Sequence, residues 1–198
     1  MAHIDPLKLD EMPENLQSAM DMASNLMGFL PNSLPTMAHW PELIGGFAPM
    51  AATILRTGEL SIGLKQMIAA VVSGAAGCRY CQAHTSHVAA HAGGIDAEKI
   101  ARVWEFQNCD LFNDAECAAL ELALAAGQVP NASNQSHFDR LKQFYSDREI
   151  VEIVAVISLF GFLNRWNDTM ATELEAEPLE FAQQNFAAAH WDIGKHGA

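Results

Sequence analysis

Apolar side chains recur at every third or fourth position along most of this chain, and short breaks rich in Gly, Pro or Asn separate the runs. That spacing puts apolar side chains on one face of an α-helix, whereas no convincing run alternates with the period of two that a strand requires. The pattern predicts an all-α protein of eight or nine helices. The expected helices cover residues 14–29, 39–56, 62–76, 78–92, 96–106, 113–127, 136–145, 147–170 and 178–189.

Polar residues at the expected helix starts support these boundaries. Ser61, Asp96 and Asn113 are residue types whose side chains accept hydrogen bonds from first-turn N–H groups. Glu116 follows Asn113 by three residues, which is the spacing of a capping box. The expected helix at 62–76 is rich in small residues, so we expect neighbouring helices to approach it closely; these residues are Ala69, Ala70, Ser73, Gly74, Ala75 and Ala76.

The composition is that of one globular domain. The chain has 198 residues, half of them apolar, which is enough to bury a core without cross-links. Its formal net charge of −13 argues against binding to nucleic acid and to anionic membrane surfaces, both of which need clustered Lys and Arg. The first residues do not resemble an export signal, and the apolar run at 150–163 is too short to span a membrane. We therefore expect a cytoplasmic protein.

The reactive side chains gather in one stretch, residues 77–87. Cys78 and Cys81 form a C-x-x-C pair at the expected start of a helix, and His84 and His87 follow at intervals of three. The first turn of a helix favours a thiolate, because its free N–H groups and its dipole stabilise negative charge. A nearby imidazole can accept and return a proton. These residues therefore suit a dithiol peroxidase or a disulfide reductase.

Two other interpretations of this stretch stay open. The two cysteines and two histidines are suitable zinc ligands, but structural zinc sites usually take ligands from two separated segments, and these four share one face of one helix. The second alternative is buried packing, which is the more natural account of His91. Cys109 and Cys117 are expected to be structural, and with four cysteines and no export signal a disulfide scaffold is not expected.

Two segments resemble a known family. Residues 65–85, KQMIAAVVSGAAGCRYCQAHT, resemble the core of the carboxymuconolactone decarboxylase-like superfamily on its alkylhydroperoxidase D-like (AhpD-like) side. Residues 153–168, IVAVISLFGFLNRWND, resemble the branch usually called peroxidase-related. The resemblance implies a single AhpD-like all-α domain over residues 1–198, with its core motif at 62–92. It also implies assembly as trimers or hexamers, with the dithiol at the bottom of a cleft near a subunit boundary.

The resemblance assigns roles to individual residues and exposes a gap. Cys81 corresponds to the cysteine that attacks peroxide, and Cys78 to the one that resolves the product as a disulfide. Gln66 stands where the family has a proton-relay glutamate, and Thr85 stands where it most often has the relay histidine.

A different proton path is therefore expected in this chain. Either His84, together with His87, moves the protons, or a carboxylate from elsewhere replaces the missing one. The two candidates for that carboxylate are Glu59 and Asp168.

The leading hypothesis is a thiol-dependent peroxidase or disulfide reductase in antioxidant defence. It implies a hydroperoxide substrate, an external thiol or dithiol reductant, no bound cofactor and no metal. The alternatives are lactone decarboxylation, which in this superfamily does not depend on a cysteine pair, and a non-catalytic metal-binding or redox-sensing subunit. Residues 71–73 and 156–158 share a register, so 147–171 is a candidate second repeat that lacks the chemistry.

Overall fold

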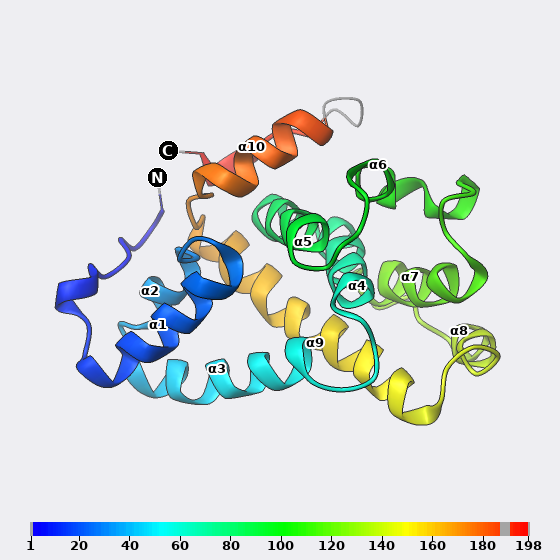
Figure 1. Cartoon of the computed structure of the whole chain (residues 1–198), viewed down its shortest axis with the longest axis horizontal. Helices are drawn as coiled ribbons and strands as arrows, with labels where there is room; N and C mark the ends of the chain where they lie inside the picture. The colour runs from blue at the N-terminus through cyan, green and yellow to red at the C-terminus, as the bar shows by residue number, and fades with distance from the viewer. Residues whose placement is uncertain (1, 187–190, 198) are drawn as a thin grey trace.

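A computed structural model describes residues 2–186 and 191–197 and confirms an all-α fold for them. Its helices are η1 Leu9–Glu11, α1 Glu14–Met27, α2 Ser33–Met37, α3 Pro41–Arg56, α4 Ile62–Ala75, α5 Arg79–His91, α6 Ala97–Ala101, η2 Val103–Asn108, α7 Asp114–Ala126, α8 Gln135–Leu141, α9 Asp147–Met170, α10 Ala176–Asn185 and η4 Gly194–His196. Figure 1 shows α4 and α5 at the centre, α1 to α3 on one side and α6 to α8 on the other.

Helix α4 is the centre of the core. Ten of its fourteen residues are buried, and it packs against α5, α7 and α9. The small side chains make this possible: Ala69 and Ala70 have no exposed surface, and the main chain of Gly63 lies directly against that of Gly93. The close approach of neighbouring helices expected from these small residues is therefore observed. Ser61 caps α4 by accepting a hydrogen bond from the N–H of Leu64 at 3.2 Å.

A buried cation fixes the loop that enters α4. The ammonium of Lys65 is 1% exposed, donates a hydrogen bond to the carbonyl of Ile54 at 2.9 Å, and lies 3.4 Å from the carboxylate of Glu152 on α9. That carboxylate also accepts hydrogen bonds from the N–H groups of Glu59 and Leu60 at 2.9 and 3.1 Å. Because a buried charge is costly unless it is paired, this network holds the end of α3, the start of α4 and α9 together.

Several expected boundaries need correction. The single helix predicted at 96–106 is two elements, because the chain tightens to 3₁₀ winding after Arg102 and so brings Val103 and Phe106, three residues apart, into the core. The prediction missed α2. Pro35 occupies its third position, where a backbone N–H has no intrahelical partner to lose. Pro178 is likewise the third residue of its helix, so α10 begins at Ala176 rather than at Pro178 as predicted.

The remaining differences are at helix ends. Helix α8 spans Gln135–Leu141 rather than 136–145, and residues 187–189, predicted to end the last helix, lie outside the described residues. The candidate repeat stays a prediction. Its register aligns Cys78 with Leu163. The backbones differ at these two positions, because a turn separates Cys78 from α4, whereas α9 continues through Leu163. In the part of the chain that the structure describes, no helix has the length and hydropathy needed to cross a membrane.

The contact between Gly63 and Gly93 makes a prediction about stability. A Cβ built on Gly63 would lie 2.8 Å from the carbonyl oxygen of Gly93 and 2.6 Å from Ile95, so Gly63→Ala forces α4 away from the end of α5. We expect a loss of about 1–3 kcal/mol in the free energy of unfolding, measured by urea denaturation.

Gly46→Ala is the matched control. Gly46 is an exposed residue of α3 whose Cβ would meet nothing within 4 Å. Alanine should stabilise the protein there by about 0.4–1 kcal/mol, because it restricts the unfolded chain. Equal effects of the two substitutions would contradict the close packing described for α4.

Candidate active site

A left-handed turn places the cysteine pair at the start of α5. Gly77 has a φ of +77°, which a residue with a Cβ rarely adopts, and it reverses the chain directly after α4. The N–H of Cys78 donates to the carbonyl of Ser73 at 3.0 Å, and Cys78 becomes the N-cap residue of α5. Cys81 is the third residue of the helix. Both sulfurs therefore lie beside the N-terminal end of a helix, as the spacing predicts.

The two thiols differ in environment and are not joined by a disulfide. The pKa of Cys78 is lowered to about 6, because the Cys81 thiol donates a hydrogen bond to it and His196 acts in the same direction, against the opposing effect of burial. Burial, and then the hydrogen bond and charge of Cys78, raise the pKa of Cys81 well above its usual value. Asn167 on α9 donates to the sulfur of Cys81 at 3.4 Å. The pair thus shares one proton, with the negative charge favoured on Cys78.

A carboxylate that was not expected from the sequence, Glu175, lies beside His84 in the link between α9 and α10. Its Oε2 accepts a hydrogen bond from Nε2 of His84, and its Oε1 accepts one from the hydroxyl of Tyr80 at 2.8 Å. The backbone N–H of Asn32 is a further donor to Oε1. Although burial alone would raise it, the pKa of Glu175 is lowered, because His84 and backbone N–H groups favour the carboxylate. Glu175 is therefore ionised at neutral pH.

Tyr80 and His84 form one stacked unit with this carboxylate. Their ring centroids are 4.2 Å apart at an interplanar angle of 23°, and Phe29 contacts His84 edge-on at 5.1 Å. Burial and the charge of Glu175 raise the pKa of Tyr80 well above its usual value, so its hydroxyl stays protonated. The orientation of the His84 ring is thus set by a carboxylate on one side and aromatic rings around it.

A second histidine reaches the pair from the C-terminal segment. His196 is 1% exposed, and the hydrogen bond between its Nδ1 and the carbonyl of Thr172, at 2.8 Å, fixes the ring. Its Nε2 lies 3.7 Å from the carboxylate of Asp168, and the ring also contacts Tyr80 with centroids 5.8 Å apart. The hydrogen bond and the charge of His196 favour the thiolate of Cys78.

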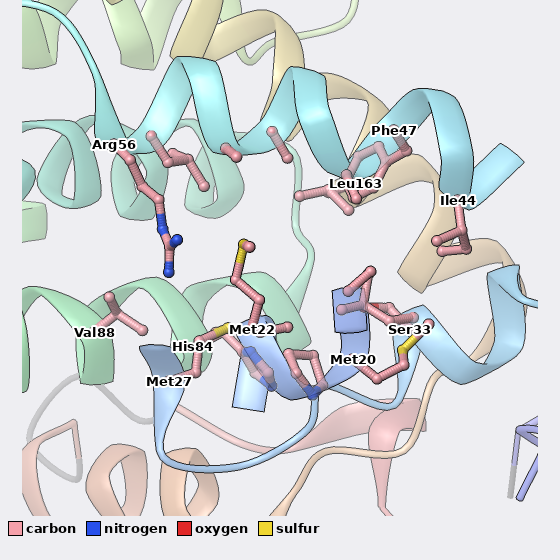
Figure 2. A pocket seen from close by; sticks show the side chains of 18 of the residues that line it. Met20, Met22, Met27, Ser33, Ile44, Phe47, Arg56, His84, Val88 and Leu163 are labelled. Atoms are coloured by element: carbon pink, nitrogen blue, oxygen red, sulfur yellow. The ribbon is translucent and has the colours of Figure 1, made fainter. Parts of the chain in front are cut away.

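One cysteine of the pair borders an apolar cavity of about 530 Å³. Cys81, His84, Gln66 and Thr85 line the cavity, whereas Cys78 does not. Figure 2 shows His84 approaching from α5 among methionines of α1, with α3 on the opposite side. The hydroxyl of Thr85 donates to the carbonyl of Cys81 at 2.8 Å, which is a bond within the helix. Gln66 is 6% exposed and faces the same space from α4.

The other predicted site residues lie apart from this arrangement. His87 stacks on His91 with ring centroids 4.1 Å apart and packs against Phe29 and Phe181. Burial, and then the charges of His91 and His84, lower the pKa of His87 to about 4, so it is neutral at pH 7. It does not line the cavity, and its role in proton transfer stays a prediction.

Of the two carboxylates proposed from the sequence, Glu59 lies away from the cysteine pair, whereas Asp168 lies beside His196. Glu59 pairs with Arg148 at 3.2 Å on the surface, and Asp168 pairs with Lys195 at 2.9 Å. Glu175 and His196 were not expected at the site, because each is about ninety residues or more from α5 and carries no local motif. Among the described residues, no group of three or more His, Cys, Asp or Glu side chains is arranged to hold a metal ion.

Comparison with known proteins agrees with the resemblance of the core segment. The model of the carboxymuconolactone decarboxylase family matches residues 41–125. The protein YnjA of Escherichia coli K12, which is uncharacterised, is 27% identical over 107 residues, or 54% of this chain. The match covers 58% of YnjA, so this chain spans less than two thirds of that relative.

Solved structures extend the similarity over almost the whole chain. A cysteine-to-alanine variant of the debrominase Bmp8, in complex with 2,3,4-tribromopyrrole, is 35% identical with a TM-score of 0.87, over 93% of this chain and 97% of that one. A peroxidase-related protein from Ralstonia eutropha JMP134 with an AhpD core is 22% identical with a TM-score of 0.80, over 91% and 95% of the two chains, and shows the same fold. This chain belongs to the carboxymuconolactone decarboxylase family.

Proposed function

We propose that this protein is a thiol-dependent reductase that passes two electrons from Cys78 and Cys81 to an apolar electrophile, with an organic hydroperoxide as the first candidate substrate. One observation carries the proposal: a helix-terminal cysteine pair borders an apolar cavity through Cys81, beside a histidine held by a buried carboxylate. An apolar cavity of about 530 Å³ suits a bulky organic peroxide better than hydrogen peroxide, which is small and polar.

Cys81 is the attacking sulfur in this proposal because only it lines the cavity. The lower pKa of Cys78 fits a resolving role, since the second thiol has to be a thiolate when Cys81 is oxidised. The lower pKa of Cys78 also fits the reduction of the disulfide that regenerates the pair. An external thiolate would attack the accessible sulfur of Cys81, and the thiol of lower pKa, Cys78, is the better leaving group.

The steps balance without any cofactor. After Cys81 transfers its shared proton to Cys78, its thiolate attacks the outer peroxide oxygen, the O–O bond breaks, and the products are a sulfenic acid on Cys81 and an alkoxide that takes up a proton. Cys78 then attacks that sulfenic sulfur, the S–O bond breaks, and the proton of Cys78 passes to the leaving hydroxide, so that the products are the disulfide and water. An external dithiol then reduces the disulfide and supplies the two electrons that the peroxide consumed.

His84 is the proton donor to the leaving oxygen in this proposal. It lines the cavity together with Cys81, and its Nε2 is fixed on Glu175. A carboxylate on one ring nitrogen stabilises the imidazolium and orients the ring, as in other carboxylate–histidine pairs. Gln66 has no proton to give, and we propose that it contacts the substrate as a polar group on α4.

A second candidate activity is reductive dehalogenation of an aromatic substrate. The similarity to the debrominase Bmp8 at 35% identity, over almost the full length of both chains, favours it. The same pair would serve: the Cys81 thiolate takes the halogen as a sulfenyl halide, the aromatic carbanion takes up a proton, and Cys78 displaces halide to form the disulfide. The cavity is large enough for a ring of that size.

Cysteine variants test both activities in one assay. We expect Cys81→Ser to lower turnover of cumene hydroperoxide, or release of bromide from a polybrominated pyrrole, by at least about 100-fold, with dithiothreitol as reductant. Cys78→Ser should still react once, leaving a sulfenic acid on Cys81 that dimedone traps.

Cys117→Ser is the matched control and should be unaffected. The substrate with the larger kcat/KM identifies the reaction. Full activity of Cys81→Ser toward both substrates would end the proposal.

Removing the carboxylate beside His84 tests the proton path. Glu175→Gln should lower kcat about 10- to 100-fold, because the imidazole of His84 loses the carboxylate that orients it. Glu173→Gln, at an exposed position two residues earlier, is the control, and melting temperatures show whether both variants fold. Gln66→Glu should not raise kcat, since His84 already has a carboxylate. The proposed path is wrong if Glu175→Gln keeps its activity or Gln66→Glu gains it.

The pKa of Cys78 gives a pH prediction. Its thiolate should be present above about pH 6 and lost below it, so activity should fall as the pH drops through that value. His196→Gln removes a group that lowers this pKa, and should move the thiolate absorbance step near 240 nm to higher pH. The titration of Cys78→Ser is subtracted as background, and exposed His39→Gln is the control. An unchanged step in His196→Gln would show that His196 does not act on the pair.

A further inference from the structure

Among the described residues that line the cavity, Arg56 is the one Lys, Arg, Asp or Glu, and it is exposed to solvent. It occupies the last turn of α3, and Figure 2 shows its side chain pointing into the cavity from the side opposite His84 and Val88. The other lining residues are apolar or neutral polar side chains apart from the cysteine and histidine of the site, and no Asp or Glu is among them. Arg56 is therefore a permanent cation on the wall of a mostly apolar space, on the side opposite His84.

Of the basic side chains that the structure describes, five have no carboxylate partner, and of these only Arg56 lines the cavity; the other four are Lys8, Arg79, Lys142 and Arg165. Arg140, Arg148 and Lys195 each pair with a carboxylate within 4 Å. Within the described residues, Arg56 makes no ion pair, although the sequence holds 24 acidic residues against 11 basic ones. A cation at the end of a helix is favoured by the helix dipole, but that effect does not require the side chain to point into a cavity. An anion inside the cavity would complete its pairing.

We propose that the cavity binds an apolar organic molecule that carries one anionic group, such as a carboxylate, which Arg56 holds. The guanidinium donates paired hydrogen bonds that match the two oxygens of such a group. Met20, Met22 and Met27 of α1 cover the apolar body, and their flexible side chains adapt to its shape. The reactive end would then face Cys81, a placement that rests on the proposed function.

Two fluorescent probes with one skeleton test this without any thiol chemistry. Anilinonaphthalene sulfonate carries an anionic group, and phenylnaphthylamine is the same aromatic body without it. Both are titrated into the wild-type protein and into Arg56→Gln at constant ionic strength, since salt screens such contacts. We expect Arg56→Gln to weaken binding of the sulfonate about tenfold, as for loss of one charge-assisted contact, and to leave the neutral probe within about twofold.

Two further variants separate the cavity from the rest of the surface. Arg165→Gln removes an exposed arginine of α9 that lies outside this cavity and should change neither titration. Ala52→Trp fills part of the cavity from α3 and should weaken both probes. Equal affinities of the two probes for wild type, or an equal change for both in Arg56→Gln, would overturn the proposal. An inactive cysteine pair would leave the binding result intact, so the two proposals fail separately.

Discussion

The buried carboxylate of Glu175 is the interaction on which the site depends. An ionised carboxylate inside a protein costs several kcal/mol unless charges and hydrogen bonds compensate it. Here the compensation comes from His84 and Tyr80 on α5 and from the backbone of Asn32 at the start of α2. Because the carboxylate of Glu175 needs all of these hydrogen bonds, the link after α9 has to pack against α5 and against the N-terminal helices. The same contacts orient His84, which lines the cavity. The hydrogen bonds of Glu175 therefore fix both the packing of these segments and the geometry of the site.

The two thiols have different surroundings, and these suit them to different steps of the reaction. Cys78 is fully buried beside His196 and is favoured as a thiolate, while Cys81 faces the cavity and shares the proton. This division suits a cycle in which the accessible sulfur meets the substrate and the buried one completes the disulfide. The family includes enzymes of different chemistry, a debrominase among them, so membership alone does not define the reaction. We propose that the apolar walls of the cavity and the cation of Arg56 select the substrate.

Local features of the sequence were enough to predict most of the fold and half of the site. Caps at Ser61 and Asn113 and the small residues of α4 are signals read within one helix, and they were confirmed. The C-x-x-C pair and His84 share one helix, so their proximity followed from spacing. Glu175 and His196 could not be found in this way, because tertiary folding brings them to α5 from a link and from the C-terminal segment. The change from α-helix to 3₁₀-helix after Arg102 also depends on tertiary packing, because it buries Val103 in the core.

Peptide mapping of the oxidised wild-type protein tests the central claim most directly. The purified chain is reduced, treated with one equivalent of cumene hydroperoxide, alkylated, digested and analysed by mass spectrometry. The account predicts one intramolecular disulfide between Cys78 and Cys81, with Cys109 and Cys117 recovered as alkylated thiols. A disulfide that involves Cys109 or Cys117, or four alkylated thiols after the oxidant has been consumed, would contradict it.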